Sequence, residues 1–454
     1  MSLLILAAAL LPWAATPADV VTRTFVAISV LSVEMQIATL TGAGSLATLP
    51  WFNLIVAAAA IAWQWRREPP FARVRDAFAP AIPAPALALL GGAVLVLAML
   101  LPFQAADPYH LEKIATIERS GTLAYSADVE PKVNLVGWLY ELVLADVRQI
   151  PVAGGALARG HGLAGLALLS CAIAALAGWL APVPRRWPYV AIAVTPVLFH
   201  QFVLVKNDLF LAIPALTALA WLITHAERAT PSGTAWAGWL LGTVVASKIT
   251  NYPFALAALA LVVIAQRRRA AAAVGGLALG GVIGACSGGL MYSFVENAKW
   301  YGDPLARHAL AEMGNVTGSV GAALASIARF AVSLFDLGLI TRHVWPGRGG
   351  WGGTFGLPLI WAFFVIATQL RREPAARRAL AVAVAHWLAF AAAFPDADLT
   401  HRLVLAPGLL VIGVAAHAAC ADTPRAHMAR LALWPVAALS AAQIARSALL
   451  YVKL

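Results

Sequence analysis

Residues 162–182 read GLAGLALLSCAIAALAGWLAP and contain no charged side chain. They are the uncharged part of an apolar run over 152–182, and Arg185 and Arg186 follow them. An α-helix needs about 20 predominantly apolar residues to cross the hydrocarbon core of a bilayer. The stretch therefore predicts a membrane-spanning helix that ends at a basic loop.

The rest of the chain has the same character. Of its 454 residues, 61% are hydrophobic and 12% are charged, whereas about a quarter of the residues of a soluble domain are charged. A single soluble core could not bury so much apolar surface, but a bilayer can solvate it. We predict an all-α, polytopic transmembrane helical bundle of about 12–14 spans. The apolar runs lie near 2–16, 24–46, 50–65, 84–103, 152–182, 187–205, 208–224, 234–250, 252–265, 271–295, 354–370, 378–395, 401–420 and 428–450.

Arginine clusters between these runs predict the orientation. The net charge of +11 would suggest nucleic acid in a soluble protein. Here the charge lies in short loops, as expected for the cytoplasmic side of a membrane protein. With these loops inside, the two longest polar segments, 104–150 and 296–353, become external. The clusters are Arg66, Arg67, Arg73 and Arg75; Arg185 and Arg186; Arg267, Arg268 and Arg269; Arg371, Arg372, Arg377 and Arg378; Arg425 and Arg430.

Two units are predicted along the chain. Residues 1–76 form an added set of N-terminal transmembrane helices, and 77–454 form the main module with both external loops. The N-terminal stretch MSLLILAAALLPWAATPADV lacks the basic start of a signal peptide, so we favour a retained helix. Amphipathic juxtamembrane helices are expected in the first external loop. The later loop has one at 326–341, which we expect to lie in the membrane interface or to fold back.

The first external loop carries the first candidate residues. Asp107 follows an apolar run and precedes Pro108, Tyr109 and His110. Aspartate before proline is also a good helix N-cap, so a purely structural role is the alternative. Further along, Glu130 and Lys132 precede a second amphipathic segment, where surface solvation is an equally good explanation.

Two short external turns carry the next group. Lys206 and Asp208 stand between two apolar runs, where a tight turn also favours polar residues. Lys248 lies near the external end of its run, where the orientation rule disfavours a positive charge. It could bind a phosphate or extend its amine to the lipid headgroups.

The last group opens the second loop and a late helix. It contains Asn297, His308 and Arg402, and all the candidates share the external side. Carboxylates there could abstract a proton, and lysine or arginine could stabilise an anionic leaving group. No spacing of these residues demands a metal, so no cofactor is evident, although paired external acids are compatible with a divalent cation.

Taken in order, these motifs resemble the GT-C superfamily of integral membrane glycosyltransferases. The resemblance covers about 85–420 and rests on several segments. They are DPYHL at 107–111, EPKVN at 130–134, KNDL at 206–209, GWLLGTVVASKITNY at 238–252, NAKWYGDP at 297–304 and the stretch from His401-Arg402-Leu403 to Pro407.

The resemblance implies a hexosyl or pentosyl transferase of the bacterial cytoplasmic membrane, with its active site on the periplasmic face. A polyprenyl-phosphate-linked sugar would be the donor, and a lipid or glycan of the cell envelope would be the acceptor. Asp107 would be the catalytic base of an inverting transfer. Lys206, Lys248, Arg402 and His308 would hold the departing phosphate, and Glu130 and Asp208 would orient a sugar or the acceptor. Further substrate-binding residues would be Tyr109, His110, Lys132 and Asn297.

Two other functions stay open. A transporter or flippase for a lipid or glycan would need no catalytic base. An O-antigen-type polymerase or ligase would share the external site but would use a different loop pattern.

Overall fold

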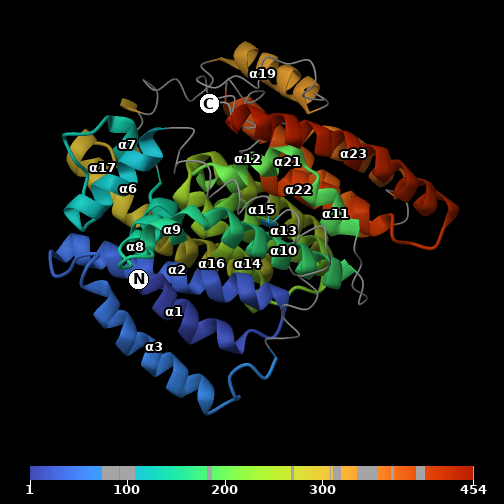
Figure 1. Cartoon of the computed structure of the whole chain (residues 1–454). Coiled ribbons are helices and arrows are strands. Elements are labelled where there is room, and N and C mark those ends of the chain that lie inside the picture. The colour runs from blue at the N-terminus through green and yellow to red at the C-terminus, as the bar shows by residue number, and fades with distance from the viewer. Residues whose placement is uncertain are drawn as a thin grey trace.

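A computed structural model gives the fold of the chain, and Figure 1 shows it as a bundle of helices. The structure describes residues 1–73, 91–92, 108–135, 137–180, 187–266, 270–306, 308–309, 319–334, 355–369, 373–394 and 404–452. No strand occurs within these ranges, so the all-helical prediction is confirmed for them. The first helices are α1 (Ser2–Leu10), η1 (Leu11–Trp13), α2 (Pro17–Thr41), α3 (Leu49–Trp65), α6 (Pro108–Ser120), α7 (Pro131–Leu135), α8 (Leu139–Arg148) and α9 (Gly154–Arg159).

The remaining helices form most of the bundle. One predicted apolar run, 187–205, forms two short helices that are separated by Val194 and Thr195. The helix breaks there because Pro196 has no backbone N–H to donate. The helices are α10 (His161–Leu180), α11 (Trp187–Ala193), α12 (Pro196–Val203), α13 (Asn207–His225), η2 (Ala226–Arg228), α14 (Pro231–Ser247), η3 (Ile249–Asn251), α15 (Tyr252–Gln266), α16 (Ala270–Ser287), α17 (Leu290–Tyr301), α19 (Val320–Ser333), α20 (Leu357–Gln369), α21 (Pro374–Ala393), α22 (Leu405–Ala418) and α23 (Pro424–Val452).

Several of these helices are long and apolar enough to cross a membrane. The described residues contain six of them: Pro17–Thr41, His161–Leu180, Asn207–Arg228, Ala270–Ser287, Pro374–Ala393 and Pro424–Ala445. The helix His161–Leu180 is the one that the apolar stretch at 162–182 predicts. Shorter apolar helices of 10–17 residues accompany them: Ser2–Trp13, Leu49–Trp65, Tyr252–Gln266, Val320–Ser333, Leu357–Thr368 and Leu405–Ala418.

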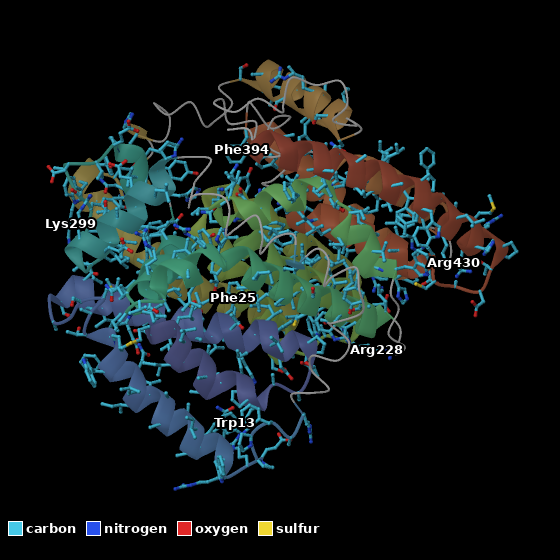
Figure 2. All side chains as sticks on the ribbon, in the orientation of Figure 1. Trp13, Phe25, Arg228, Lys299, Phe394 and Arg430 are labelled. Atoms are coloured by element: carbon cyan, nitrogen blue, oxygen red, sulfur yellow. The ribbon has the colours of Figure 1, made fainter. Side chains whose placement is uncertain are left out.

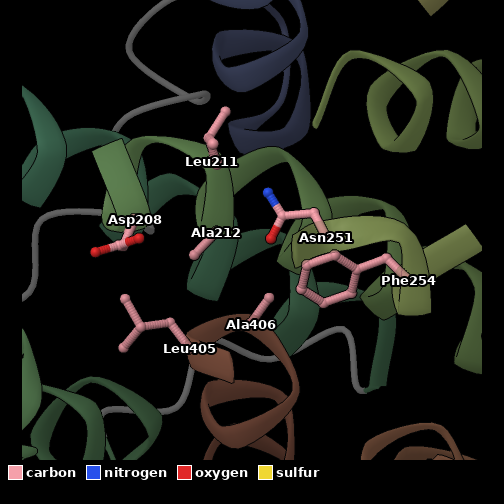
Figure 3. Close-up of a pocket in the computed structure, with 7 residues that line it drawn as sticks. All are labelled: Asp208, Leu211, Ala212, Asn251, Phe254, Leu405 and Ala406. Carbon is pink, nitrogen blue, oxygen red and sulfur yellow. The ribbon is translucent and has the colours of Figure 1, made fainter. Parts of the chain in front are cut away.

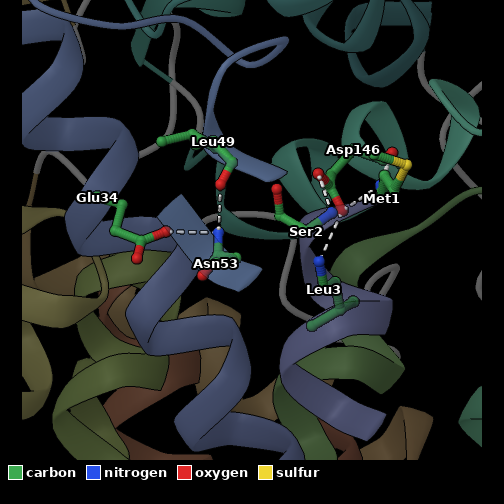
Figure 4. A network of polar contacts seen from close by, with 7 residues as sticks. All are labelled: Met1, Ser2, Leu3, Glu34, Leu49, Asn53 and Asp146. Atoms are coloured by element: carbon green, nitrogen blue, oxygen red, sulfur yellow. Dashed lines mark hydrogen bonds and ion pairs between the residues drawn. The ribbon is translucent and has the colours of Figure 1, made fainter. Parts of the chain in front are cut away.

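The N-terminal helices pack on the main body. Asp146 of α8 lies at the start of α1, where its carboxylate accepts hydrogen bonds from the backbone N–H groups of Ser2 and Leu3 at 3.0 and 2.9 Å (Figure 4). Glu34 of α2 accepts a bond from the Asn53 side chain of α3 at 2.7 Å in the same view. The ring of Phe25 in α2, labelled near the centre of Figure 2, lies 5.3 Å from the ring of Phe210 in α13. Residues 1–73 are therefore joined to the bundle through α2 and α8.

Helices α14 and α16 run parallel along a seam of glycines. A Cβ atom added to Gly280 would lie 1.8 Å from the backbone oxygen of Ala235, so the two backbones are in direct contact. Small residues permit this approach between membrane helices. The same close approach of the two backbones recurs every four residues along the helices. Gly276 faces Pro231, Gly284 faces Trp239 and Gly288 faces Thr243.

The loops divide between two ends of the bundle. At one end, which we call the basic end, the N–H of Phe71 bonds to the backbone oxygen of Pro12 at 2.7 Å. The Arg378 guanidinium bonds there to the backbone oxygen of Ile223 at 2.9 Å. Figure 2 labels three residues of this end, Trp13 at the bottom, Arg228 at the lower right and Arg430 at the right, whereas Lys299 lies at the left.

The other end, which we call the cap end, carries α6, α7, α8 and α17 (Figure 1). There the N–H of Leu46, just after α2, bonds to the backbone oxygen of Gly121 at 2.8 Å. The N–H of Leu123 bonds to the Thr39 hydroxyl at 3.0 Å. The described part of the first predicted external loop therefore covers the end of α2, away from the basic end.

Candidate functional site

The site begins at α6, an amphipathic helix at the cap end. Its first residue is Pro108, whose fixed φ suits the first turn of a helix. Ile114 and Ile117 lie on its buried face, which packs on α8. Glu118 and Arg148 join the two helices at their rim, with an N–O distance of 3.1 Å. An amphipathic helix is thus present within the predicted first loop, and Asp107, the predicted base, lies just outside the described residues.

Three ionisable side chains are buried between α6 and α8. The Nδ1 atom of His110 lies 2.5 Å from Oε1 of Glu141, and both side chains are almost fully buried. Lys113, one turn after His110, is also buried. Desolvation lowers the pKa of Lys113 to about 8, although the nearby Glu141 carboxylate raises it in part. We call His110, Lys113 and Glu141 the cap triad.

Helix α17 joins this layer through Asn297. The Tyr125 hydroxyl donates to Oδ1 of Asn297 at 2.8 Å, and Nδ2 of Asn297 donates to the backbone oxygen of Pro304 at 3.0 Å. The Nζ atom of Lys113 lies 5.4 Å from the centre of the Tyr125 ring. Burial raises the pKa of Tyr125, so its hydroxyl remains a donor at neutral pH. Asn297 therefore fixes the fold of the cap in this arrangement.

Two predicted candidates form an ion pair. Nζ of Lys248 lies 2.6 Å from Oδ1 of Asp208 and 3.1 Å from Oδ1 of Asn207. Lys248 directly follows the C-terminus of α14, and Asp208 lies in the first turn of α13. The helix dipoles favour a cation at the first position and an anion at the second. The amine thus pairs with a carboxylate in this structure.

A small pocket lies beside this pair (Figure 3). Asp208, Asn251 and Phe254 line it from α13, η3 and α15, and Leu405 and Ala406 line it from α22. Its free space corresponds to about one water molecule. A sugar ring could therefore enter only if these helices moved apart.

Tyr140 of α8 lies between the cap triad and the ion pair. Desolvation raises its pKa well above the usual value, and the charges of Glu141 and Asp208 raise it further. Its ring is 5.3 Å from the ring of Phe210 in α13. The cap triad and the Lys248–Asp208 pair are therefore neighbours across α8 and α13.

The other predicted residues lie around these groups. The side chain of Lys206 is buried directly before α13. The Tyr109 ring lies 4.2 Å from the His110 ring, and Nζ of Lys132 lies 4.7 Å from the centre of the Tyr109 ring. Glu130 is exposed, and its backbone oxygen accepts the bond that starts α7. His308 is exposed, and Arg402 lies outside the described residues.

Sequence reasoning missed Lys113 and Glu141. One signal for Lys113 was present, because residues three apart on a helix share a face, and Lys113 shares the face of His110. Glu141 stands among apolar residues in the segment LYELVL (139–144), where a buried acid requires a partner. Its partner comes from another helix, and no local pattern identifies it.

The described residues contain no group of three or more His, Cys, Asp or Glu side chains that could hold a metal ion. Comparison of the chain with family models, curated proteins and solved structures finds no match.

Proposed function

We propose that the chain is a GT-C-type glycosyltransferase of about 12–14 spans in the bacterial cytoplasmic membrane. It would transfer a hexosyl or pentosyl unit from a polyprenyl-phosphate carrier to a lipid or glycan acceptor at the external face. One observation carries this proposal. Helix α6 with Tyr109 and His110 packs on α8, α8 packs on α13, and Asp208 of α13 pairs with Lys248 at the end of α14. These segments are separate in sequence, yet all lie at the end of the bundle opposite the basic turns.

The reaction needs a base and a stabilised leaving group. Asp107 takes the proton of the acceptor hydroxyl as its oxygen attacks the anomeric carbon. The bond from that carbon to the phosphate oxygen breaks, which inverts the configuration. The released lipid phosphate takes the electron pair, and Lys206, Lys248, Arg402 and His308 balance its charge.

The Lys248–Asp208 pair suggests how the donor is received. When the donor binds, its phosphate oxygens would replace the carboxylate of Asp208 as the partner of the Lys248 amine. Asp208 would then accept a hydroxyl of the sugar, as Glu130 would at the rim. Because the pocket beside the pair is small, donor binding requires α13, α15 and α22 to separate there.

Replacing Asp107 with asparagine tests the base. In protein reconstituted in membranes with a lipid-linked sugar, Asp107→Asn should lower the transfer rate about a hundred- to ten-thousandfold, the usual contribution of general base catalysis. Asp128→Asn is the control, because Asp128 is an exposed acid of the same loop. Normal transfer by Asp107→Asn would remove Asp107 from its role.

The same variant separates the other functions. A lipid or glycan transporter has no base, so Asp107→Asn should move its cargo at the wild-type rate. A polymerase or ligase would extend or attach a preformed glycan chain and would not add a single sugar. Mass spectrometry of the product distinguishes these outcomes by the mass added to the acceptor.

A further inference from the structure

Helix α16 is exposed along most of its length and leads directly to α17. It has 18 residues, and only 28% of them are buried within the protein. Leu279, Val282 and Ile283 are each more than half exposed, as expected for a helix that faces lipid. At about 1.5 Å per residue α16 extends about 27 Å, close to the thickness of about 30 Å of the hydrocarbon core. A spanning α16 therefore reaches the surface of the bilayer where α17 begins.

Two glycines separate α16 from α17. Gly289, the second of them, has a φ of 99°, a left-handed conformation that glycine adopts without strain. A Cβ atom at this position would lie 2.2 Å from the ring of Trp138, the residue before α8. The break thus lets the chain change direction at the end of α16, and it also receives a side chain from the cap end.

The side of α17 that is buried in the protein carries polar residues. Glu296 and Asn297 are both buried there, and Asn297 accepts the hydrogen bond from Tyr125. Tyr292 is buried on the same side, with its ring 6.1 Å from the Trp138 ring in an edge-to-face arrangement. This side of α17 therefore faces the other segments of the cap end.

The opposite side of α17 is apolar and exposed. Met291 and Val295 are 55% and 39% exposed, and Ala298 is exposed as well. Residues three and four apart share one side of a helix, so the three side chains form a single stripe. A helix on the surface of a soluble protein has the reverse arrangement, with its apolar stripe on the core and its polar residues in water. The outward side of α17 is therefore suited to lipid.

We propose that α17 lies on the surface of the bilayer at the cap end, with Met291, Val295 and Ala298 in contact with lipid. Helices of this kind bury their apolar side at the boundary between the headgroups and the acyl chains. Lys299 stands at the edge of the stripe, paired with Glu296 at 2.7 Å and 60% exposed, so its amine can extend to the headgroups. The other side of α17 then holds the cap end at the membrane surface, whatever reaction takes place there.

Spin labels on the outward side of α17 measure which medium covers it. Met291→Cys and Val295→Cys would each carry a nitroxide in protein reconstituted in lipid bilayers, with the native cysteines Cys171, Cys286 and Cys420 replaced by alanine. Paramagnetic resonance gives the collision rates with oxygen, which concentrates in lipid, and with a nickel–EDDA complex, which stays in water.

Two further positions calibrate the measurement. Leu279→Cys lies midway along α16 and reports the hydrocarbon core, whereas Asp128→Cys lies on the exposed first loop and reports water. We expect the ratio of oxygen to nickel collision rates at positions 291 and 295 to be well above the ratio at 128. It should stay below the ratio at 279, because the bilayer surface is shallower than the core.

Ratios at 291 and 295 that match the ratio at 128 would place this side in water and overturn the proposal. Low collision rates with both reagents would overturn it too, since they would show that protein, such as a second copy of the chain, covers the stripe. If Met291→Cys does not fold, Val295→Cys decides alone, because both residues lie on the same side. The measurement needs no substrate, so its outcome is independent of the proposed glycosyl transfer.

Discussion

Lys113 makes the stability of the cap dependent on pH. Its pKa falls from 10.5 in the unfolded chain to about 8 in the fold. Between these values the unfolded chain binds a proton that the folded chain has released, so stability rises with pH in this window. The shift corresponds to about 3 kcal/mol.

Lys113→Met should remove this dependence. The stability difference between the two proteins should shift in favour of the wild type by about 3 kcal/mol as the pH rises from 8 to 10.5, because only the wild type carries the shifted lysine. Thermal unfolding of both proteins in the same lipid or detergent, at pH 7 and above pH 10, measures it. Parallel curves for the two proteins would contradict the burial of a charged lysine.

The ion pair between Lys248 and Asp208 should show strong coupling. Only 16% of the lysine and 4% of the aspartate side chain are exposed. Removing one partner leaves the other charge poorly solvated, so Asp208→Asn or Lys248→Met should each cost about 3 kcal/mol. The double variant should lose much less than the sum of the two. Additive losses in thermal unfolding would show that the groups do not interact.

Sequence reasoning found the members of this site better than their partners. Asp208 and Lys248 could be named because polar residues at the ends of apolar runs are rare. Their pairing could not be predicted, because it depends on how α13 and α14 pack. For the same reason His110 was found and Glu141 was missed, since the sequence does not show which face of α8 meets α6.

At the scale of elements, the contact between α14 and α16 should tolerate no added atoms. Gly280→Ala would place a Cβ atom 1.8 Å from the backbone oxygen of Ala235, which forces the helices apart. We expect a loss of about 1–3 kcal/mol. Gly275→Ala is the control in the same helix, because its Cβ atom would meet nothing within 4 Å.

Thermal unfolding of the two alanine variants measures this difference. Gly275→Ala should be neutral or more stable by up to about 1 kcal/mol, since alanine favours the helix. Equal stability of the two variants would contradict the close packing. The displacement of α14 in Gly280→Ala should also disturb the Lys248–Asp208 pair, because Lys248 directly follows α14.

The helices themselves could be predicted where length and hydropathy decide. The stretch at 162–182 became α10 and the run at 208–224 became α13, because the need to span lipid is a local property of the sequence. Two features were not predicted. The glycines at positions 276, 280, 284 and 288 mark a packing face but do not identify α14 as its partner. The run at 187–205 is broken at Pro196, so hydropathy alone overestimated its length.

At the scale of the whole molecule, the predicted orientation places the cap end outside. Lys299→Cys at the cap end and Arg228→Cys at the basic end test this, because both positions are exposed. In whole cells a membrane-impermeant maleimide should label Lys299→Cys and should label Arg228→Cys only after permeabilisation. Native Cys286 is half-buried and is replaced by alanine in both. The reverse pattern would invert the topology.

Glycosyl transfer at the cap end is the central claim, and lipid analysis tests it most directly. Mass spectrometry would compare the lipid-linked sugars and glycolipids of cells that lack the gene with those of cells that carry the wild type or Asp107→Asn. Cells with Asp107→Asn should match those without the gene, with a polyprenyl-phosphate sugar accumulating and one hexose or pentose missing from an acceptor. Full restoration of the acceptor by Asp107→Asn, or an acceptor unchanged when the gene is absent, would contradict the account.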